Sequence, residues 1–285
     1  MKTVFELRKQ IYAYQRKKHS YIFDKWKWYN YRKYKAILYM EVAPWLAYIA
    51  MKANIHPNTV TVTYAIMGIL GGIFIAIPLK WLVLAGIFLF YFRGCLDWAD
   101  GLLARATGQT TITGDCLDPY GAQTGWVALW AGMGLYVANQ TGENIFFYLA
   151  PIAPITVALN AGWYAHNVLY GKYVVKGVRD YLLKEQGQSR PSSNSSDAMT
   201  RNPKLVQTMT FLDKKVFAHH AGSVDLVCLI IFIELFISIS ISWVIYLAFL
   251  AWHILFFIAT FYVVARGGWI ENELEKKVKQ VHDND

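Results

Sequence analysis

The sequence predicts an all-α, polytopic membrane protein with six membrane-spanning helices after a basic N-terminal segment. Of its 285 residues, 55% are apolar and only 16% are charged, whereas a soluble domain usually carries about 25% charged residues. Several apolar runs reach the roughly 20 residues that a spanning helix needs. The 11 tryptophans and 19 tyrosines suit the boundary between hydrocarbon and water.

The N-terminal segment, residues 1–57, is rich in cations and aromatic side chains. Residues 22–53 have the mixture that is typical of an amphipathic helix lying in the membrane interface. A short cytoplasmic helix packed on the bundle is the alternative. The first twenty residues are too polar to supply the apolar core of a cleavable signal peptide.

The transmembrane domain is expected over residues 58–265, followed by a polar cytoplasmic tail at 266–285. A stretch rich in serine, asparagine and proline, residues 186–203, is expected to be a flexible loop. Only "SISIS" separates the fifth span from the sixth. The six expected spans are about 58–78, 81–104, 115–138, 144–170, 222–240 and 241–265.

The distribution of lysine and arginine predicts the orientation. These residues concentrate in the N-terminal segment and in residues 171–221, while Lys80 stands alone on the opposite side. The positive-inside rule therefore places both termini and the acidic stretch described next on the cytoplasmic side. The net charge of +9 is a topology and membrane-surface signal, and no nucleic-acid partner is expected. Three cysteines fit neither a disulfide framework nor a metal spacing: Cys95, Cys116 and Cys228.

Four carboxylates stand together between two apolar blocks. Asp97 and Asp100 share one helix face, and Asp115 and Asp118 repeat the same spacing on the next helix. The short link between the helices predicts antiparallel neighbours that bring the two pairs together. Carboxylates without histidine or cysteine favour a hard cation such as Mg²⁺, Mn²⁺ or Ca²⁺.

Small residues accompany these acids and permit the close approach of helices or of a bulky ligand. Together with Arg105, which can hold a phosphate through two parallel hydrogen bonds, they suit a metal-bound diphosphate. A cluster of helix caps and salt bridges at the membrane surface is the alternative. The small residues are Gly101, Ala104, Gly108, Gly114 and Gly121.

The spacing resembles a known family signature. Asp97-x2-Asp100-Gly101-x2-Ala104-Arg105-x8-Gly114-x3-Asp118 matches the pattern D-x2-D-G-x2-A-R-x8-G-x3-D-x3-D of the CDP-alcohol phosphotransferases at every fixed position but the last. The stretch "HPNTVT", which contains Asn58 and Thr61, is similar to that family's entry into its first helix.

The resemblance implies transfer of a substituted phosphate from a CDP-linked donor to an alcohol, with release of CMP. It also implies two divalent ions, Mg²⁺ or Mn²⁺, a cytoplasmic cavity and a homodimer. By position, the metal ligands are Asp97, Asp100 and Asp118. The CDP site takes in Asp97, Gly101, Ala104, Arg105 and Gly114, with Asn58 and Thr61 as further candidates. The resemblance indicates no residues for the acceptor.

Ala122 occupies the position of the family's fourth aspartate, which serves as a metal ligand and as the proposed base. One hypothesis is that this chain binds donor but transfers slowly or not at all. A second is that Asp115 supplies the fourth carboxylate beside Asp118, although a first-turn acid of the third span is the alternative for Asp115. A third takes the base from His219 or His220.

Two other functions remain open at this point. A non-catalytic membrane protein that binds CDP or a CDP-lipid would retain the other motif acids but not the fourth carboxylate, whose position Ala122 occupies here. A prenyl-diphosphate transferase would also use acidic helices and Mg²⁺, but it would need a second acidic motif that the sequence after residue 118 lacks. On the second span, Arg93 is expected to form an ion pair with Asp97, one turn away, with binding of the acceptor as the alternative.

Overall fold

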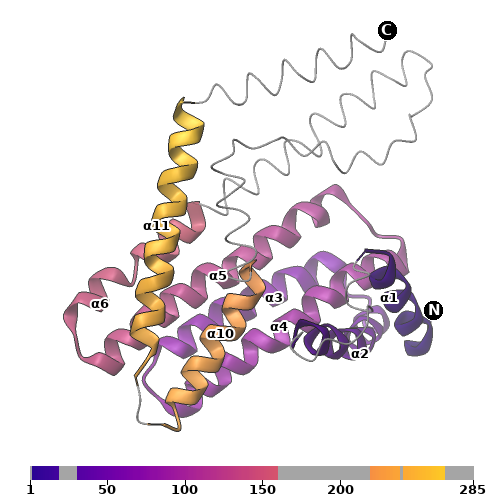
Figure 1. Cartoon of the computed structure of the whole chain (residues 1–285). Helices are drawn as coiled ribbons and strands as arrows, with labels where there is room; N and C mark the ends of the chain where they lie inside the picture. The colour runs from indigo at the N-terminus through magenta and orange to yellow at the C-terminus, as the bar shows by residue number, and fades with distance from the viewer. Residues whose placement is uncertain (1, 19–30, 160–218, 238–239, 267–285) are drawn as a thin grey trace. The chain divides into compact units, whose positions relative to one another are not determined.

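We describe the protein from a computed structural model in which residues 2–18, 31–159, 219–237 and 240–266 are described. These residues contain helices and no strand, so the prediction of an all-α chain is confirmed for them. The chain divides into two units, each considered by itself below (Figure 1). The first comprises Met1–Pro151 with Leu235–Ser238, and the second comprises Ile152–Glu234 with Ile239–Asp285.

Three helices in the described part are long and apolar enough to cross a membrane. They are α3 (Pro57–Ala76), α4 (Lys80–Thr107) and the Ser242–Ala259 part of α11 (Ser242–Arg266). The first two coincide with the first two expected spans. The expected third span lies inside α5 (Ile112–Thr141), a helix whose first turns are polar. Six spans are therefore not confirmed.

The fourth expected span begins as α6 (Asn144–Leu149), and an apolar helical stretch continues to Leu159. Its remainder and the expected loop at 186–203 lie outside the described residues. The tail expected at 266–285 lies outside them as well, apart from Arg266.

In the second unit, the expected end of the fifth span lies too late in the sequence, whereas the sixth expected span starts within one residue of the observed helix. Helix α10 (His219–Glu234) ends before residue 240, and α11 begins at Ser242. The Glu234 carboxylate accepts hydrogen bonds from the backbone N–H groups of Ile241 and Ser242, the latter at 2.6 Å. An acid at a helix N-terminus satisfies free N–H groups and complements the helix dipole. This cap explains why α11 starts at Ser242.

The N-terminal segment forms two helices, α1 (Val4–Lys18) and α2 (Tyr31–Lys52). Helix α1 begins with a reciprocal cap: the Thr3 N–H donates to Glu6 at 2.7 Å, and the Glu6 N–H donates to the Thr3 hydroxyl at 3.3 Å. Such a Thr-x-x-Glu box satisfies two helix-end donors. Most of the stretch predicted as one interfacial helix is α2, and α1 is an additional element.

Helix α1 belongs to the packed core of the first unit. Leu7 and Ile11 are fully buried in a cluster with Met40 of α2 and Leu102 and Leu103 of α4. Buried side chains of this kind contribute about 1.5–3 kcal/mol each relative to exposure. The N-terminal helix is therefore held on the bundle through its apolar face.

Helix α3 packs extensively against both α4 and α5, which make few direct contacts with each other. The short link predicted α4 and α5 as antiparallel neighbours, but both pack mainly on α3 and not on each other. The three helices lie side by side in the first unit (Figure 1). The acids of α4 and α5 approach one another beside α3, which supplies side chains of its own to the same place.

Bare glycine surfaces explain why α3 takes this position. A Cβ atom on Gly68 of α3 would lie 2.7 Å from the Gly125 Cα of α5, and one on Gly86 of α4 would lie 2.7 Å from the Gly71 carbonyl oxygen of α3. Real Cβ atoms do not approach other atoms so closely. Small residues on both sides of α3 let its backbone approach two partners at once.

Candidate active site

A cavity of about 280 Å³ in the first unit gathers the predicted motif. Helices α1, α3, α4 and α5 and the α4–α5 link all contribute to its wall. All ten predicted metal, nucleotide and alternative acid residues line it: Asn58, Thr61, Asp97, Asp100, Gly101, Ala104, Arg105, Gly114, Asp115 and Asp118. Ala122, at the position of the missing acid, is not part of this wall.

The ends of α4 and α5 explain how the link brings the acids to this cavity. Gly108 ends α4 in the left-handed conformation, with φ 71°, which glycine adopts without strain. Thr111 caps α5, because its hydroxyl accepts from the Gly114 N–H at 3.0 Å. Asp115 is the acid of the first turn of α5, which is the alternative role expected for it, and it also lines the cavity.

Asp100 is anchored by α3. The Thr61 hydroxyl lies 2.5 Å from Asp100 Oδ2 and donates to it, and both residues are buried. A hydrogen bond to an ionised acceptor is short and strong. It fixes one oxygen of Asp100, which lines the cavity. Thr61, predicted as a possible nucleotide contact, thus contacts a motif acid directly.

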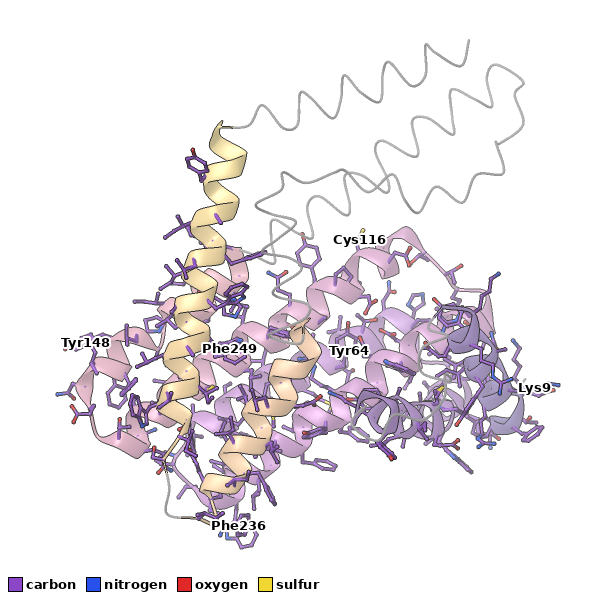
Figure 2. All side chains as sticks on the ribbon, viewed as in Figure 1. Lys9, Tyr64, Cys116, Tyr148, Phe236 and Phe249 are labelled. Carbon is purple, nitrogen blue, oxygen red and sulfur yellow. The ribbon has the colours of Figure 1, made fainter. Side chains whose placement is uncertain are left out.

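Asp118 is anchored by Tyr64 of α3, which is labelled in Figure 2. The fully buried Tyr64 hydroxyl lies 2.7 Å from the Asp118 carbonyl oxygen and 3.0 Å from Asp118 Oδ1. Gly121 makes room for this contact, since a Cβ atom there would lie 2.7 Å from the tyrosine oxygen. Gly121, one of the small residues that accompany the acids, therefore serves the placement of an acid one turn away.

Two motif acids from different helices meet. The Asp97 and Asp118 carboxyl groups lie within hydrogen-bonding reach of each other, and both interact electrostatically with Asp100. Carboxylates at this distance repel unless a proton or a cation lies between them. The oxygen-only donor set fits Mg²⁺ or Mn²⁺. In the described part of the chain, however, no three metal-ligating side chains already surround one point.

Arg93 does not form the expected ion pair with Asp97. Its guanidinium donates to the backbone carbonyls of Gly121 and Ala122, at 3.0 and 3.2 Å. A Cβ atom on Gly125 would collide with this guanidinium. The physical reason for the difference is that glycines on α5 leave a slot for the side chain, and exposed carbonyl oxygens in that slot accept its protons. Arg93 therefore holds the backbone at the position of the missing acid.

Arg105 lies at the opposite end of the motif and faces helix α1. Its guanidinium carbon is 3.9 Å from the centre of the Tyr14 ring, a stacked cation–π contact. Its buried Nε has no hydrogen-bond partner. Stacking fixes the plane of the guanidinium of a residue that lines the cavity, and a fixed plane favours a bidentate phosphate contact.

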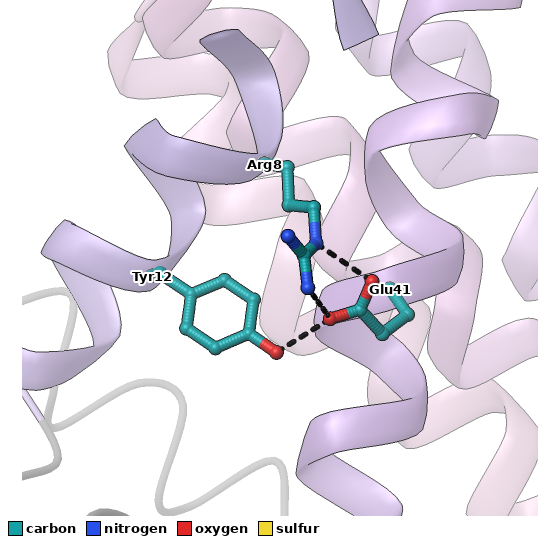
Figure 3. A network of polar contacts seen from close by, with 3 residues as sticks. All are labelled: Arg8, Tyr12 and Glu41. Atoms are coloured by element: carbon teal, nitrogen blue, oxygen red, sulfur yellow. Dashed lines mark hydrogen bonds and ion pairs between the residues drawn. The ribbon is translucent and has the colours of Figure 1, made fainter. Parts of the chain in front are cut away.

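A surface network ties α1 to α2 (Figure 3). Arg8 donates two hydrogen bonds to Glu41, both at 2.7 Å, and the Tyr12 hydroxyl donates to the same carboxylate at 2.6 Å. The hydrogen bond from Arg8 lowers the pKa of Glu41 below its ordinary value, and the hydrogen bond from Tyr12 is the next largest cause. The network fixes the turn of α1 that precedes its cavity-lining residues.

Among the cavity-related side chains that sequence reasoning missed are Tyr64, Tyr14 and Gln15. Tyr64 lies one turn after Thr61 on α3, so helical spacing from the "HPNTVT" stretch was a usable signal. No local sequence pattern predicted that Tyr14 and Gln15 line the cavity, because their position depends on how α1 packs on the other helices. His219 and His220 begin α10, and their side chains lie outside the described residues.

The comparisons with known proteins agree with the motif. A family model described as CDP-alcohol phosphatidyltransferase matches residues 54–200, just over half of the chain. No curated protein and no solved structure matches the chain. Members of this family are membrane transferases that bind CDP-alcohol donors and alcohol acceptors and generally depend on a divalent metal. The chain belongs to the CDP-alcohol phosphatidyltransferase family.

Proposed function

We propose that this chain is a metal-dependent membrane phosphotransferase that moves a substituted phosphate from a CDP-linked donor to an alcohol and releases CMP. The observation that carries the proposal is the single cavity into which Asp97, Asp100 and Asp118 open together with Arg105. Acids from two helices and an arginine at one cavity suit a diphosphate that arrives with divalent ions. Family membership supports the same reaction class.

The residues divide this work between them. Asp97, Asp100 and Asp118 would hold one or two Mg²⁺ or Mn²⁺ ions, which neutralise the diphosphate and stabilise the leaving phosphate. Thr61 and Tyr64 hold two of these acids in place. Arg105 binds a phosphate oxygen, and the bare Gly101 and Ala104 admit the nucleotide. The acceptor oxygen attacks the β-phosphorus. The bond between this phosphorus and the bridging oxygen of CMP breaks, and CMP leaves with the electron pair.

The proton of the acceptor hydroxyl needs a base, and Ala122 cannot supply one. Asp115 and Asp118 are the candidates among the residues that line the cavity. With the fourth acid absent, we infer slow transfer and intact donor binding. A non-catalytic CDP-binding membrane protein is the second candidate function, favoured by the same Ala122.

Orientation and assembly complete the proposal. The concentration of lysine and arginine in the N-terminal segment and in residues 171–221 supports a cytoplasmic location for both termini and the cavity. We further propose a homodimer, as the family resemblance implies. Spectroscopy of residues labelled on either side of the membrane and sizing in detergent test these two points.

The decisive experiment measures thermal stabilisation of the detergent-purified chain by CDP, with and without Mg²⁺. Ligand at a hundredfold excess over its Kd stabilises the folded state by about 2.7 kcal/mol, so the unfolding temperature should rise with CDP and Mg²⁺ together. Asp97→Asn should abolish the dependence on Mg²⁺. Glu143→Gln is the matched control, because Glu143 is an exposed acid outside the cavity.

CDP stabilisation that is equal with and without Mg²⁺, or unchanged in Asp97→Asn, would refute metal-assisted binding. The same measurement identifies the donor when it is repeated with CDP-diacylglycerol, CDP-choline, CDP-ethanolamine and CDP-glycerol. CMP release in the presence of an alcohol separates the transferase from the non-catalytic binder.

A further inference from the structure

Helix α1 lies outside the part of the chain that the family model matches, yet it reaches the cavity. Leu7, Ile11 and Gln15 are spaced four residues apart and form one stripe. All three are buried, with exposed fractions of 0%, 0% and 7%. The first two enter the apolar core, and the third lines the cavity. The stripe therefore turns polar where it leaves the core.

The polar member of the stripe has an unmet hydrogen-bonding capacity. The Gln15 Oε1 atom is buried and has no partner, and the same holds for Arg105 Nε in the same cavity. A buried polar atom without a partner is destabilising, so a leucine at position 15 would suit the free protein better. An unmatched acceptor and an unmatched donor in one cavity indicate a ligand that presents both a donor and an acceptor.

The distribution of hydrogen-bond donors and acceptors on the ligand indicates which part of it Gln15 contacts. Diphosphate oxygens are acceptors only, so they suit Arg105 and do not satisfy a glutamine oxygen. In the CDP part that all such donors share, hydrogen-bond donors occur on the nucleoside. The cytosine edge places an amino group beside a ring nitrogen that accepts, which matches the oxygen and the NH₂ group of one glutamine amide.

We propose that α1 forms the nucleoside wall of the donor site, and that Gln15 recognises the amino group of cytosine. Tyr14, which precedes Gln15 in the helix, stacks on the Arg105 guanidinium in the same cavity. This inference rests on the proposed function, because it assigns the base end of the same CDP site. It adds a specificity-determining residue that lies outside the matched family region.

Two substitutions at position 15 test the proposal through the affinities for CDP and UDP in the presence of Mg²⁺. Gln15→Leu should lower CDP affinity about tenfold, the scale of one lost hydrogen bond in a buried site. Its ligand-free unfolding temperature should stay equal or rise, since leucine extends the apolar stripe. Gln15→Glu should lower the ratio of CDP affinity to UDP affinity, because a carboxylate repels the cytosine ring nitrogen that the glutamine NH₂ group contacts and accepts from the N–H that uracil has at the same ring position.

Gln10→Leu is the matched control, since Gln10 lies on the same helix, bonds to Lys2 and does not line the cavity. The proposal is overturned if Gln15→Leu affects CDP affinity no more than Gln10→Leu does. It is also overturned if Gln15→Glu leaves the CDP-to-UDP ratio unchanged, which would assign the contact to the ribose. If the native chain shows no Mg²⁺-dependent CDP binding, the proposed function itself fails; native binding with an unaffected Gln15→Leu refutes this inference alone.

Discussion

Two arginines of helix α4 have opposite surroundings. Arg93 is buried, and its guanidinium bonds to two carbonyls of α5 and lies 5.6 and 6.0 Å from the ring centres of Tyr64 and Phe90. Arg105 lies three turns further along, lines the cavity, and keeps a buried nitrogen without a partner. The protein satisfies the first arginine and leaves the second unsatisfied.

This difference separates a structural cation from one that is available to a ligand. A buried polar group that finds its partners inside the fold is a structural element, whereas one that lacks them carries a cost that a ligand can remove. The motif spacing already predicted a phosphate contact for Arg105, whereas only the structure shows that the partners of Arg93 are backbone carbonyls. Three tests, in order of expected effect, examine the comparison.

The largest effect is expected at the position whose carbonyl Arg93 holds. Ala122→Asp restores the acid that the family motif has there, beside a backbone that Arg93 already fixes. If the missing base limits turnover, the rate of CMP release should rise by about 10²–10⁴. Gln123→Asp adds the same charge one residue along and serves as the control. Unchanged turnover with intact CDP binding would reject the hypothesis of a missing base.

The second test crowds each arginine with one methyl group. Gly125→Ala should lower the free energy of unfolding by about 1–3 kcal/mol, because a Cβ atom there collides with the enclosed Arg93 guanidinium. Gly101→Ala places its Cβ atom 3.1 Å from Arg105 Nη1, at the end of a side chain that faces a cavity.

Gly101→Ala should therefore keep or raise stability, since alanine is favoured over glycine inside a helix by about 1 kcal/mol, and it should weaken CDP binding. Denaturation in detergent and nucleotide titration of both variants give the two readouts. Equal loss of stability in the two variants would break the distinction between the arginines.

The smallest effect concerns the network that holds α1, and with it Tyr14, against Arg105. Glu41→Gln removes the carboxylate bound by Arg8 and Tyr12. The pKa of Glu41 is lowered by folding, so its stabilisation is present above the ordinary glutamate pKa and is lost as the pH falls through the lower, folded value. The side chains of Arg8 and Glu41 are 47% and 40% exposed, so screening keeps the effect small.

Unfolding temperatures of the native chain and of Glu41→Gln, measured from neutral pH down to below the ordinary glutamate pKa, check this prediction. The native chain should be slightly more stable at neutral pH, and the difference should vanish at the acidic end. A difference that does not depend on pH would show that the carboxylate charge is not what holds α1.

The sequence alone determined much of the first unit. Helical spacing placed Asp97 with Asp100 and Asp115 with Asp118, and the cap residue Thr111 lies just before the second pair. The motif residues line one cavity as their spacing led us to expect. These features are local, because a helix fixes the direction of side chains three and four residues apart whatever packs against it.

Only the tertiary structure decided which helices touch. Glycines at 68, 71 and 72 place α3 against α4 and α5, and the slot beside Gly125 gives Arg93 backbone partners in place of Asp97. The packing of Leu7 and Ile11 brings Gln15 to the cavity. A glycine-rich or apolar helix face indicates that another element packs there. It does not identify that element, because van der Waals contacts are possible between any two complementary surfaces. Long-range neighbours therefore emerge only from the packing of the whole bundle.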